Sequence, residues 1–210
     1  MTTLLLVRHG HTDAAGKRLT GWAPGVHLND LGREQAERLV ERLDGVRVDA
    51  IVSSPLERCR ETAAPLAKAR GRGVDARRAW IEVGYGDWTG RSISQLRRTK
   101  LWRRVMHTPS NVRFPGGESL LEVQARAVDA AFDLAAEHVR GAVVVVSHAD
   151  VIRLLVAHLA GMHADHLQRL SIDTASITAV SISDGLPRLL TVNDTDALAV
   201  LRSRRGKVGG

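Results

Sequence analysis

Residues 3–10 read TLLLVRHG, a run of apolar and β-branched residues that ends in an arginine, a histidine and a glycine. An unbroken apolar run of this length is typical of a strand that is buried on both faces of a parallel sheet. Shorter runs of the same kind occur at 50–52 and 142–146, and helical periodicity follows each of the three. Alternating strands and helices predict an α/β fold, here a three-layer α/β/α sandwich with a mostly parallel central sheet.

Capping residues place the helices between these strands. Asn29 is the expected N-cap of the helix after the first strand. Ser54 and Pro55 are expected to begin the next helix, as a cap and a first-turn proline, and this helix runs to about residue 69. Ser119 and Glu122 form a capping-box pattern that opens a long helix.

The long helix is expected to bury one apolar face, and the rest of the chain continues the alternation. A helix is predicted over 151–159, and strands are predicted over 177–183 and 189–192 with a turn at Asp184 and Gly185. The expected buried face of the long helix consists of Leu121, Ala125, Val128, Phe132, Ala135 and Val139.

Length and charge narrow the range of partners. The 210 residues suit one domain, expected over 1–200, with a basic flexible tail over 201–210. A modest positive field suits a small anionic substrate. Because aromatic residues make up only 3%, the basic stripe and stacking rings of a nucleic-acid interface are not expected. Four of the seven net positive charges lie in the tail, which leaves about +3 for the rest, and they belong to Arg202, Arg204, Arg205 and Lys207.

No segment has the length and hydrophobicity of a membrane span, and residues 1–7 lack the basic start and full apolar stretch of an export signal. The single Cys59 permits no intramolecular disulfide, which fits a reducing compartment. We therefore expect a cytoplasmic protein that binds no membrane. Neither a metal nor another cofactor is indicated, and a homodimer is left open.

Polar and basic residues follow each of the three buried strands. The carboxyl ends of parallel strands meet at one edge of a sheet, where open α/β folds bind ligands, so these residues are expected to lie together. Burial of so many polar groups costs free energy unless they bind something, and phosphate is the simplest ligand. The residues are Arg8, His9 and Gly10 after the first strand, Ser53, Ser54 and Arg58 after the second, and Ser147 and His148 after the third.

Two arginines and two histidines suit phosphoryl chemistry. A guanidinium group stays charged, and it can bind two phosphoryl oxygens at once. A neutral imidazole can attack phosphorus when its other nitrogen is held by a hydrogen bond, while a second, protonated imidazole neutralises the transferring group. Both kinds of group are present at the predicted edge of the sheet.

Four motifs are spread through the chain: LVRHGHT at 6–12, SSPLERCRET at 53–62, EVGYGDWTG at 82–90 and VSHA at 146–149. In order and spacing they resemble the histidine phosphatase superfamily, which includes the cofactor-dependent phosphoglycerate mutases and many small phosphatases. The resemblance extends from about residue 4 to 180 and implies a phosphoglycerate mutase-like fold. A lone RHG triplet is weak evidence, whereas four motifs in order are strong.

The resemblance implies a role for each site residue. His9 would be the nucleophile. Glu82 would donate a proton to the leaving oxygen and later activate water, and a carboxyl beside an anionic pocket should have the raised pKa that this requires. The rest of the phosphate pocket would be Arg8, Arg58 and His148, and the substrate pocket would be lined by Thr20, Gly21 and Tyr85.

Three positions depart from the family pattern. Ala15 stands where the mutases usually carry an Asn that contacts phosphate, Ala149 where a Gly is common, and His11 where a Glu is commoner. The longer insertion and proline-rich segment of the mutases are also missing. We therefore expect hydrolysis of a small phosphomonoester, such as a sugar, polyol or phosphoglycerate conjugate, with a phosphomutase as the alternative enzyme.

Two other catalytic chemistries have little support. His158, His163 and His166 could form a metal cluster, but no carboxylate or thiolate is placed to complete it. A thiol phosphatase built on Cys59 would need an arginine six residues later, where Pro65 stands.

An aspartate nucleophile and a binding protein are the remaining alternatives. Asp194 and Asp196 follow a strand, but too little chain remains to build the fold of aspartate-based phosphatases after them, so they predict a turn. A non-catalytic phosphoprotein or nucleic-acid binder could use the same pocket. The pair of His9 and Glu82 argues against it, because binding alone needs neither a nucleophile nor an acid.

The segment 91–104 carries six cations, and Arg97, Lys100 and Arg104 are expected on one helical face. A charge run of this kind is usually a solvated face. Because the segment directly follows the Glu82 motif, the competing interpretation is a flap in which Arg97 and Lys100 contact the substrate, with Trp102 packing or stacking beside them.

Overall fold

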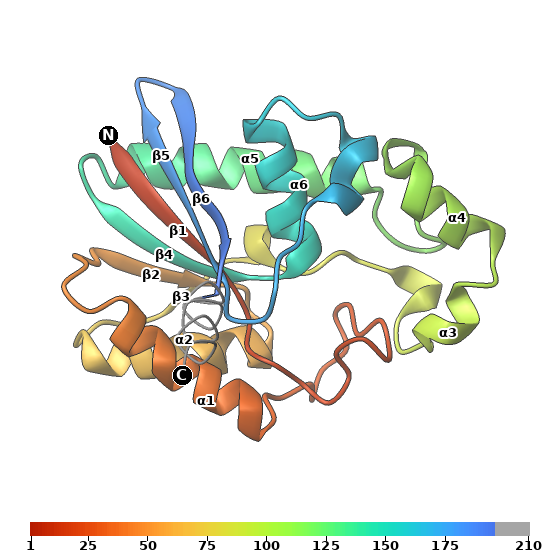
Figure 1. The fold of residues 1–210 in the computed structure, drawn as a ribbon, viewed down its shortest axis with the longest axis horizontal. Coiled ribbons are helices and arrows are strands. Elements are labelled where there is room, and N and C mark those ends of the chain that lie inside the picture. The colour runs from red at the N-terminus through yellow and green to blue at the C-terminus, as the bar shows by residue number, and fades with distance from the viewer. Residues whose placement is uncertain (196–210) are drawn as a thin grey trace, which may run out of the picture.

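The sheet has six strands in the order β3-β2-β4-β1-β5-β6 (Figure 1). Residues 1–195 are described by the computed structural model. Three of the five strand pairings are parallel, and the two that involve β5 are antiparallel. The predicted α/β fold with a parallel centre is confirmed. The strands are β1 (Thr2–Arg8), β2 (Ala50–Ser53), β3 (Asp75–Ala76), β4 (Ala142–Ser147), β5 (Ile177–Ser183) and β6 (Leu186–Asp194).

Helices cover both faces of this sheet. On one face lie α1 (Asp30–Arg42) and α2 (Glu57–Ala69), and on the other α5 (Leu120–Glu137) and α6 (Ala149–Leu159) (Figure 1). Successive residues of a strand point to opposite faces, so each central strand contributes to two cores. In β1, for example, Leu6 packs toward α5 and α6, whereas Val7 packs toward α1 and α2. This double burial explains why the central strands are apolar at every position.

The basic segment after the Glu82 motif forms two short helices instead of one. They are α3 (Ile93–Leu96) and α4 (Lys100–His107), and they lie beyond one end of the sheet (Figure 1). Thr99 separates them because its Oγ1 accepts a hydrogen bond from the Trp102 N–H at 3.1 Å and so caps α4. Single-turn 3-10 helices occur at η1 (Arg78–Trp80), η2 (Gly86–Trp88) and η3 (Pro109–Asn111), with a longer one at η4 (Ala164–Arg169).

Three of the predicted boundaries are confirmed. Asn29 caps α1, with its Oδ1 accepting from the Gly32 N–H at 3.0 Å. Ser119 and Glu122 form a complete capping box at the start of α5, with distances of 3.2 and 2.9 Å. The turn between β5 and β6 places Asp184 and Gly185 at positive φ angles of 52° and 75°.

One expectation about the helices is wrong and a second is confirmed only in part. The helix after β2 begins at Glu57, two residues beyond Pro55, and its N-cap Leu56 has no side-chain hydrogen bond. In α5 the buried positions are Leu120, Val123, Ala127, Ala130, Ala131 and Leu134, one residue out of phase with the predicted face. Of the predicted set, Val128, Phe132 and Ala135 pack against the core partly buried, whereas the other three are exposed. The sequence of α5 is apolar at both sets of positions, so periodicity could not choose between them; Leu121 of the predicted set is 44% exposed.

No helix within residues 1–195 combines the length and apolar character that crossing a bilayer requires. The basic tail predicted over 201–210 lies outside the described residues, as does Asp196.

Candidate active site

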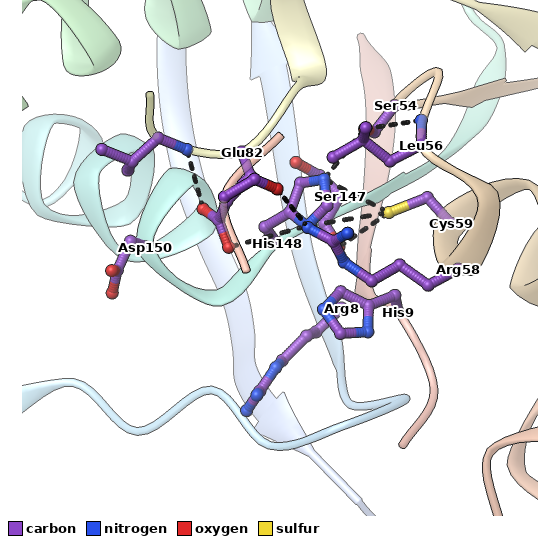
Figure 2. A network of polar contacts seen from close by, with 12 residues as sticks. Arg8, His9, Ser54, Leu56, Arg58, Cys59, Glu82, Ser147, His148 and Asp150 are labelled. Atoms are coloured by element: carbon purple, nitrogen blue, oxygen red, sulfur yellow. Dashed lines mark hydrogen bonds and ion pairs between the residues drawn. The ribbon is translucent and has the colours of Figure 1, made fainter. Parts of the chain in front are cut away.

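A cluster of charged and polar side chains lies at the carboxyl ends of β1, β2 and β4 (Figure 2). Arg8 ends β1 and His9 follows it, whereas His148 follows β4. Arg58 comes from the first turn of α2, and Glu82 from the loop between η1 and η2. The topology therefore brings all five predicted pocket and catalytic residues to one edge of the sheet.

The ring of His9 is oriented by its own backbone neighbour. Its Nδ1 lies 2.8 Å from the carbonyl oxygen of Gly10, and because a carbonyl can only accept, Nδ1 carries the proton and Nε2 keeps its lone pair. Burial, with the positive charge of Arg58 as the next contribution, lowers the pKa of His9 to about 3. The ring is therefore neutral at pH 7, which is the form that can attack phosphorus.

The loop after β1 is fixed to α2 through Gly10. A Cβ at this position would come within 2.6 Å of the Gly32 carbonyl oxygen, so only glycine fits. The Gly10 N–H donates to Thr62 Oγ1 at 2.9 Å, and the Thr62 hydroxyl donates to the Arg58 carbonyl at 2.6 Å. These contacts hold His9 and Arg58 in register with each other.

The guanidinium of Arg58 is buried, yet within residues 1–195 only one of its nitrogens has protein partners. Its Nη2 donates to the Gly21 carbonyl at 3.0 Å and to His148 Nδ1 at 3.2 Å. Among the described residues, Nε and Nη1 of Arg58 have no partner, and neither does Nε of Arg8. The Nη1 of Arg8 donates to the Ile172 carbonyl at 2.7 Å. A buried donor without an acceptor costs about 1–3 kcal/mol, and more when it is charged, so an oxyanion would be favoured here.

His148 is fully buried and neutral. Because Arg58 can only donate, His148 Nδ1 accepts, and its Nε2 donates to Ser54 Oγ at 2.8 Å. Burial, followed by the charges of Arg58 and His9, lowers the pKa of His148 well below its ordinary value. The sequence predicted a protonated second imidazole, whereas burial and, after it, the positive charge of Arg58 favour the neutral form of this ring.

Glu82 faces the same cluster. Its Oε1 accepts from the Val83 N–H at 2.9 Å, and its Oε2 lies 3.6 Å from His148 Nδ1. Burial, and after it the negative charge of Asp150, raise the pKa of Glu82 to about 7. The carboxyl is thus partly protonated near neutral pH, as a group that donates a proton and later accepts one requires.

A cavity of about 430 Å³ opens over the cluster, and Arg8, His9 and Glu82 line it. Arg58 and His148 lie behind these residues, 1% and 0% exposed. We refer to this space as the catalytic cavity.

The residues predicted to contact the substrate do not all line the same cavity. Thr20, Tyr85 and Arg97 line the catalytic cavity. Gly21 does not line it but holds Arg58 through its carbonyl. Lys100 lines a separate hollow near α4.

Comparison of the sequence with known protein families agrees with the geometry of this site. A model of the histidine phosphatase superfamily (branch 1) matches residues 4–195. The chain belongs to the histidine phosphatase superfamily. Its place in that superfamily accounts for the order of the four motifs and for the meeting of His9 with His148 at the end of the sheet, where their ring centroids are 5.2 Å apart.

Relatives cover nearly the whole chain. Phosphoserine phosphatase 1 of Hydrogenobacter thermophilus is 29% identical over 205 residues, which is 93% of each chain. The glucosyl-3-phosphoglycerate phosphatase of Mycolicibacterium vanbaalenii is 33% identical over 172 residues, 78% of this chain and 76% of its own. The solved structure of Bacillus stearothermophilus YhfR superposes with a TM-score of 0.87 at 28% identity and covers 93% of this chain and 98% of that one.

The alternative nucleophile in this histidine phosphatase is unsuited to the task. Burial raises the pKa of the Cys59 thiol to about 12, so the thiolate is scarce near neutral pH. Its Sγ packs 3.4 Å from His148 Nε2 (Figure 2). Within residues 1–195, no three His, Cys, Asp or Glu side chains are grouped so that they could hold a metal ion.

Sequence reasoning missed two functional neighbours of the motif residues. Ser54 was interpreted as a helix cap, but its hydroxyl accepts from His148. Asp150 lines the catalytic cavity, accepts from the Tyr85 hydroxyl at 2.8 Å and pairs with Arg153 at 3.1 Å. An acid in the first turn of a helix is ordinary, so only its place directly after the VSHA motif could have drawn attention to it.

Proposed function

We propose that the chain hydrolyses a small phosphomonoester through a phosphohistidine intermediate on His9. The observation that carries the proposal is the set of buried, unpartnered N–H groups of Arg8 and Arg58 beside a neutral, oriented His9 ring. Such donors suit the nonbridging oxygens of a phosphoryl group. The two relatives named as phosphatases, for phosphoserine and for glucosyl-3-phosphoglycerate, support the substrate class.

In the first step, the Nε2 lone pair of His9 forms a bond to phosphorus while the bond between phosphorus and the ester oxygen breaks. Glu82 gives its proton to that oxygen, which departs as an alcohol. Arg8 and Arg58 hold the phosphoryl oxygens and offset the charge that gathers on them.

In the second step, water attacks the phosphohistidine and gives a proton to the Glu82 carboxylate. The electrons of the N–P bond return to His9 Nε2, and inorganic phosphate leaves. The positive charge that Mg²⁺ supplies to other phosphoryl-transfer enzymes comes here from the two guanidinium groups. We therefore propose that neither a metal nor another cofactor takes part.

A phosphomutase would have to retain a phosphoryl donor and reorient an intermediate. Ala15 lines the catalytic cavity where the mutases usually carry an Asn that contacts phosphate, and its methyl group offers no hydrogen bond in place of that amide. This favours transfer to water.

The test is release of inorganic phosphate from a panel that contains phosphoserine, phosphorylated sugars and polyols, phosphoglycerates and an aryl phosphate. His9→Ala should lose turnover of every substrate while it keeps the wild-type fold by circular dichroism. The matched control is His158→Ala, which removes an exposed imidazole that does not line the catalytic cavity. Retained turnover in folded His9→Ala would overturn the proposal, and net transfer of phosphate between phosphoglycerates would favour the mutase.

A further inference from the structure

A second hollow, of about 220 Å³, lies against α4 and is strongly basic. Among residues 1–195, no Asp or Glu lines it. We call it the cationic hollow, and its lining residues are Arg97, Arg98, Thr99, Lys100, Trp102, Arg103, Met106 and His107.

The four permanent cations of the cationic hollow, Arg97, Arg98, Lys100 and Arg103, make no ion pair with any residue in 1–195. Arginines elsewhere on this protein do pair; Arg77, for instance, binds Glu137 at 2.7 Å. Four like charges beside one depression repel each other and raise the local concentration of anions.

The cationic hollow adjoins the catalytic cavity. Arg97, Trp102 and Met106 line both of them. Trp102 is held in place by stacking on Trp88, with ring centroids 6.3 Å apart and planes at 20°. A ligand that starts at His9 could therefore cross an apolar strip formed by Trp102 and Met106 and reach the unpaired cations.

We propose that the cationic hollow binds a second anionic group, a carboxylate or a phosphate, at the end of the substrate remote from the phosphate that His9 removes. This inference rests on the proposed function of the His9 site. It also revises the set of cations expected from the sequence. Arg104 donates to the Asn111 carbonyl and does not line the hollow, whereas Arg98 and Arg103 do.

The experiment compares n-alkyl phosphates of three to six carbons that end in a methyl group, a carboxylate or a second phosphate. The measured quantity is the selectivity, the kcat/KM of an end-charged substrate divided by that of the methyl-ended substrate of equal length. In the wild type, selectivity should exceed one at a preferred chain length and should fall as ionic strength rises. The carboxylate and phosphate arms identify which anion the hollow takes.

The variant Arg98→Gln/Lys100→Gln/Arg103→Gln should lower this selectivity by roughly tenfold, the size expected of several partly exposed ion pairs together. Arg97 is left in place because it also lines the catalytic cavity. The matched control, Lys68→Gln/Arg91→Gln/Arg188→Gln, removes the same charge from exposed positions that line neither space and should keep the wild-type selectivity. An equal loss of selectivity in both variants would show that only the net charge of the protein matters, and it would overturn the proposal. Unchanged selectivity in the first variant would overturn it as well.

A binding measurement separates this proposal from the proposed function. The affinity of His9→Ala for a carboxyalkyl phosphate and for the alkyl phosphate of equal length is measured by calorimetric titration. Because this variant does not turn over, the difference in affinity reports binding at the cationic hollow alone. Tighter binding of the end-charged compound, lost with the three Gln substitutions, supports the cationic hollow even if no substrate is hydrolysed. Absence of turnover in the wild type would overturn the hydrolase alone, whereas equal binding of the two compounds at every chain length would overturn the anion site alone.

Discussion

His9 and Glu82 are both buried in one cluster, and burial moves their pKa values in opposite directions. The pKa of His9 falls to about 3, whereas that of Glu82 rises to about 7. In each case the low-dielectric surroundings disfavour the charged form, which is the cation for histidine and the anion for glutamate. One physical cause thus prepares both a neutral nucleophile and a neutral acid.

Glu82→Gln tests the proposed acid through the leaving group. An alkoxide departs poorly without a proton, whereas an activated phenolate departs readily. Hydrolysis of an alkyl phosphate should therefore fall by about 10²–10⁴ more than hydrolysis of p-nitrophenyl phosphate. Steady-state kcat/KM for the two substrates gives the answer. If kcat/KM fell by the same factor for both substrates, Glu82 would be a positioning residue, and the acid would be sought at Asp87 or His11.

Asp150 should set the pH at which this acid works. Glu82 must be protonated to donate, so kcat/KM for an alkyl phosphate should decline as pH rises through about 7. Burial is the larger cause of the raised pKa and the negative charge of Asp150 the next. Asp150→Asn removes that charge, lowers the pKa of Glu82 and should shift the decline to lower pH. Asp129→Asn, at an exposed position on α5, should leave the profile in place, and an unshifted profile in Asp150→Asn would refute the electrostatic role.

At the scale of helices and strands, local signals predicted what depends on local chemistry. Asn29 and the Ser119–Glu122 capping box follow from side-chain bonds to backbone three residues away, and both are present. Ser54 is not the cap of α2, because the helix begins three residues later, and its hydroxyl accepts from the Leu56 N–H and from the distant His148. The buried face of α5 was misplaced because alanines and leucines occupy both candidate faces. Tertiary packing, which periodicity does not contain, made these two choices.

Ser119→Ala tests the contribution of the cap to stability. The substitution leaves the Glu122 N–H without its partner at the start of the longest helix. We expect a loss of about 1 kcal/mol in the free energy of unfolding, measured by urea denaturation. Ser171→Ala removes an exposed hydroxyl outside any helix and should change the free energy little. A loss no larger than that of Ser171→Ala would show that the cap adds nothing beyond the packing of α5.

The site residues that belong to a sequence motif could be predicted. Those whose position depends only on tertiary packing could not. The strand ends indicated His9, Arg8, Arg58 and His148, and the fold brings them together. Nothing in the sequence indicated that Arg98 and Arg103, rather than Arg104, face the cationic hollow. That distinction depends on the break at Thr99, which turns one predicted helix into two.

For the whole molecule, a mixed six-stranded sheet between two helical layers brings Arg8 and the buried Arg58 to one edge of the sheet. If these arginines replace a metal ion, exhaustive dialysis against EDTA should leave kcat/KM unchanged. The measurement is turnover of one substrate before and after dialysis, with and without added Mg²⁺, Mn²⁺ or Zn²⁺. Loss of activity that a divalent ion restores would contradict the charge assignment.

The central claim is a covalent phosphohistidine on His9, and rapid-quench trapping tests it most directly. The enzyme is mixed with a ³²P-labelled phosphomonoester, quenched in alkali within milliseconds, digested and mapped by mass spectrometry, because phosphohistidine survives alkali but not acid. The account predicts label on the peptide that contains His9, its discharge as inorganic phosphate at a rate no slower than kcat, and no label in His9→Ala. Label on another residue, or steady turnover by folded His9→Ala, would contradict it.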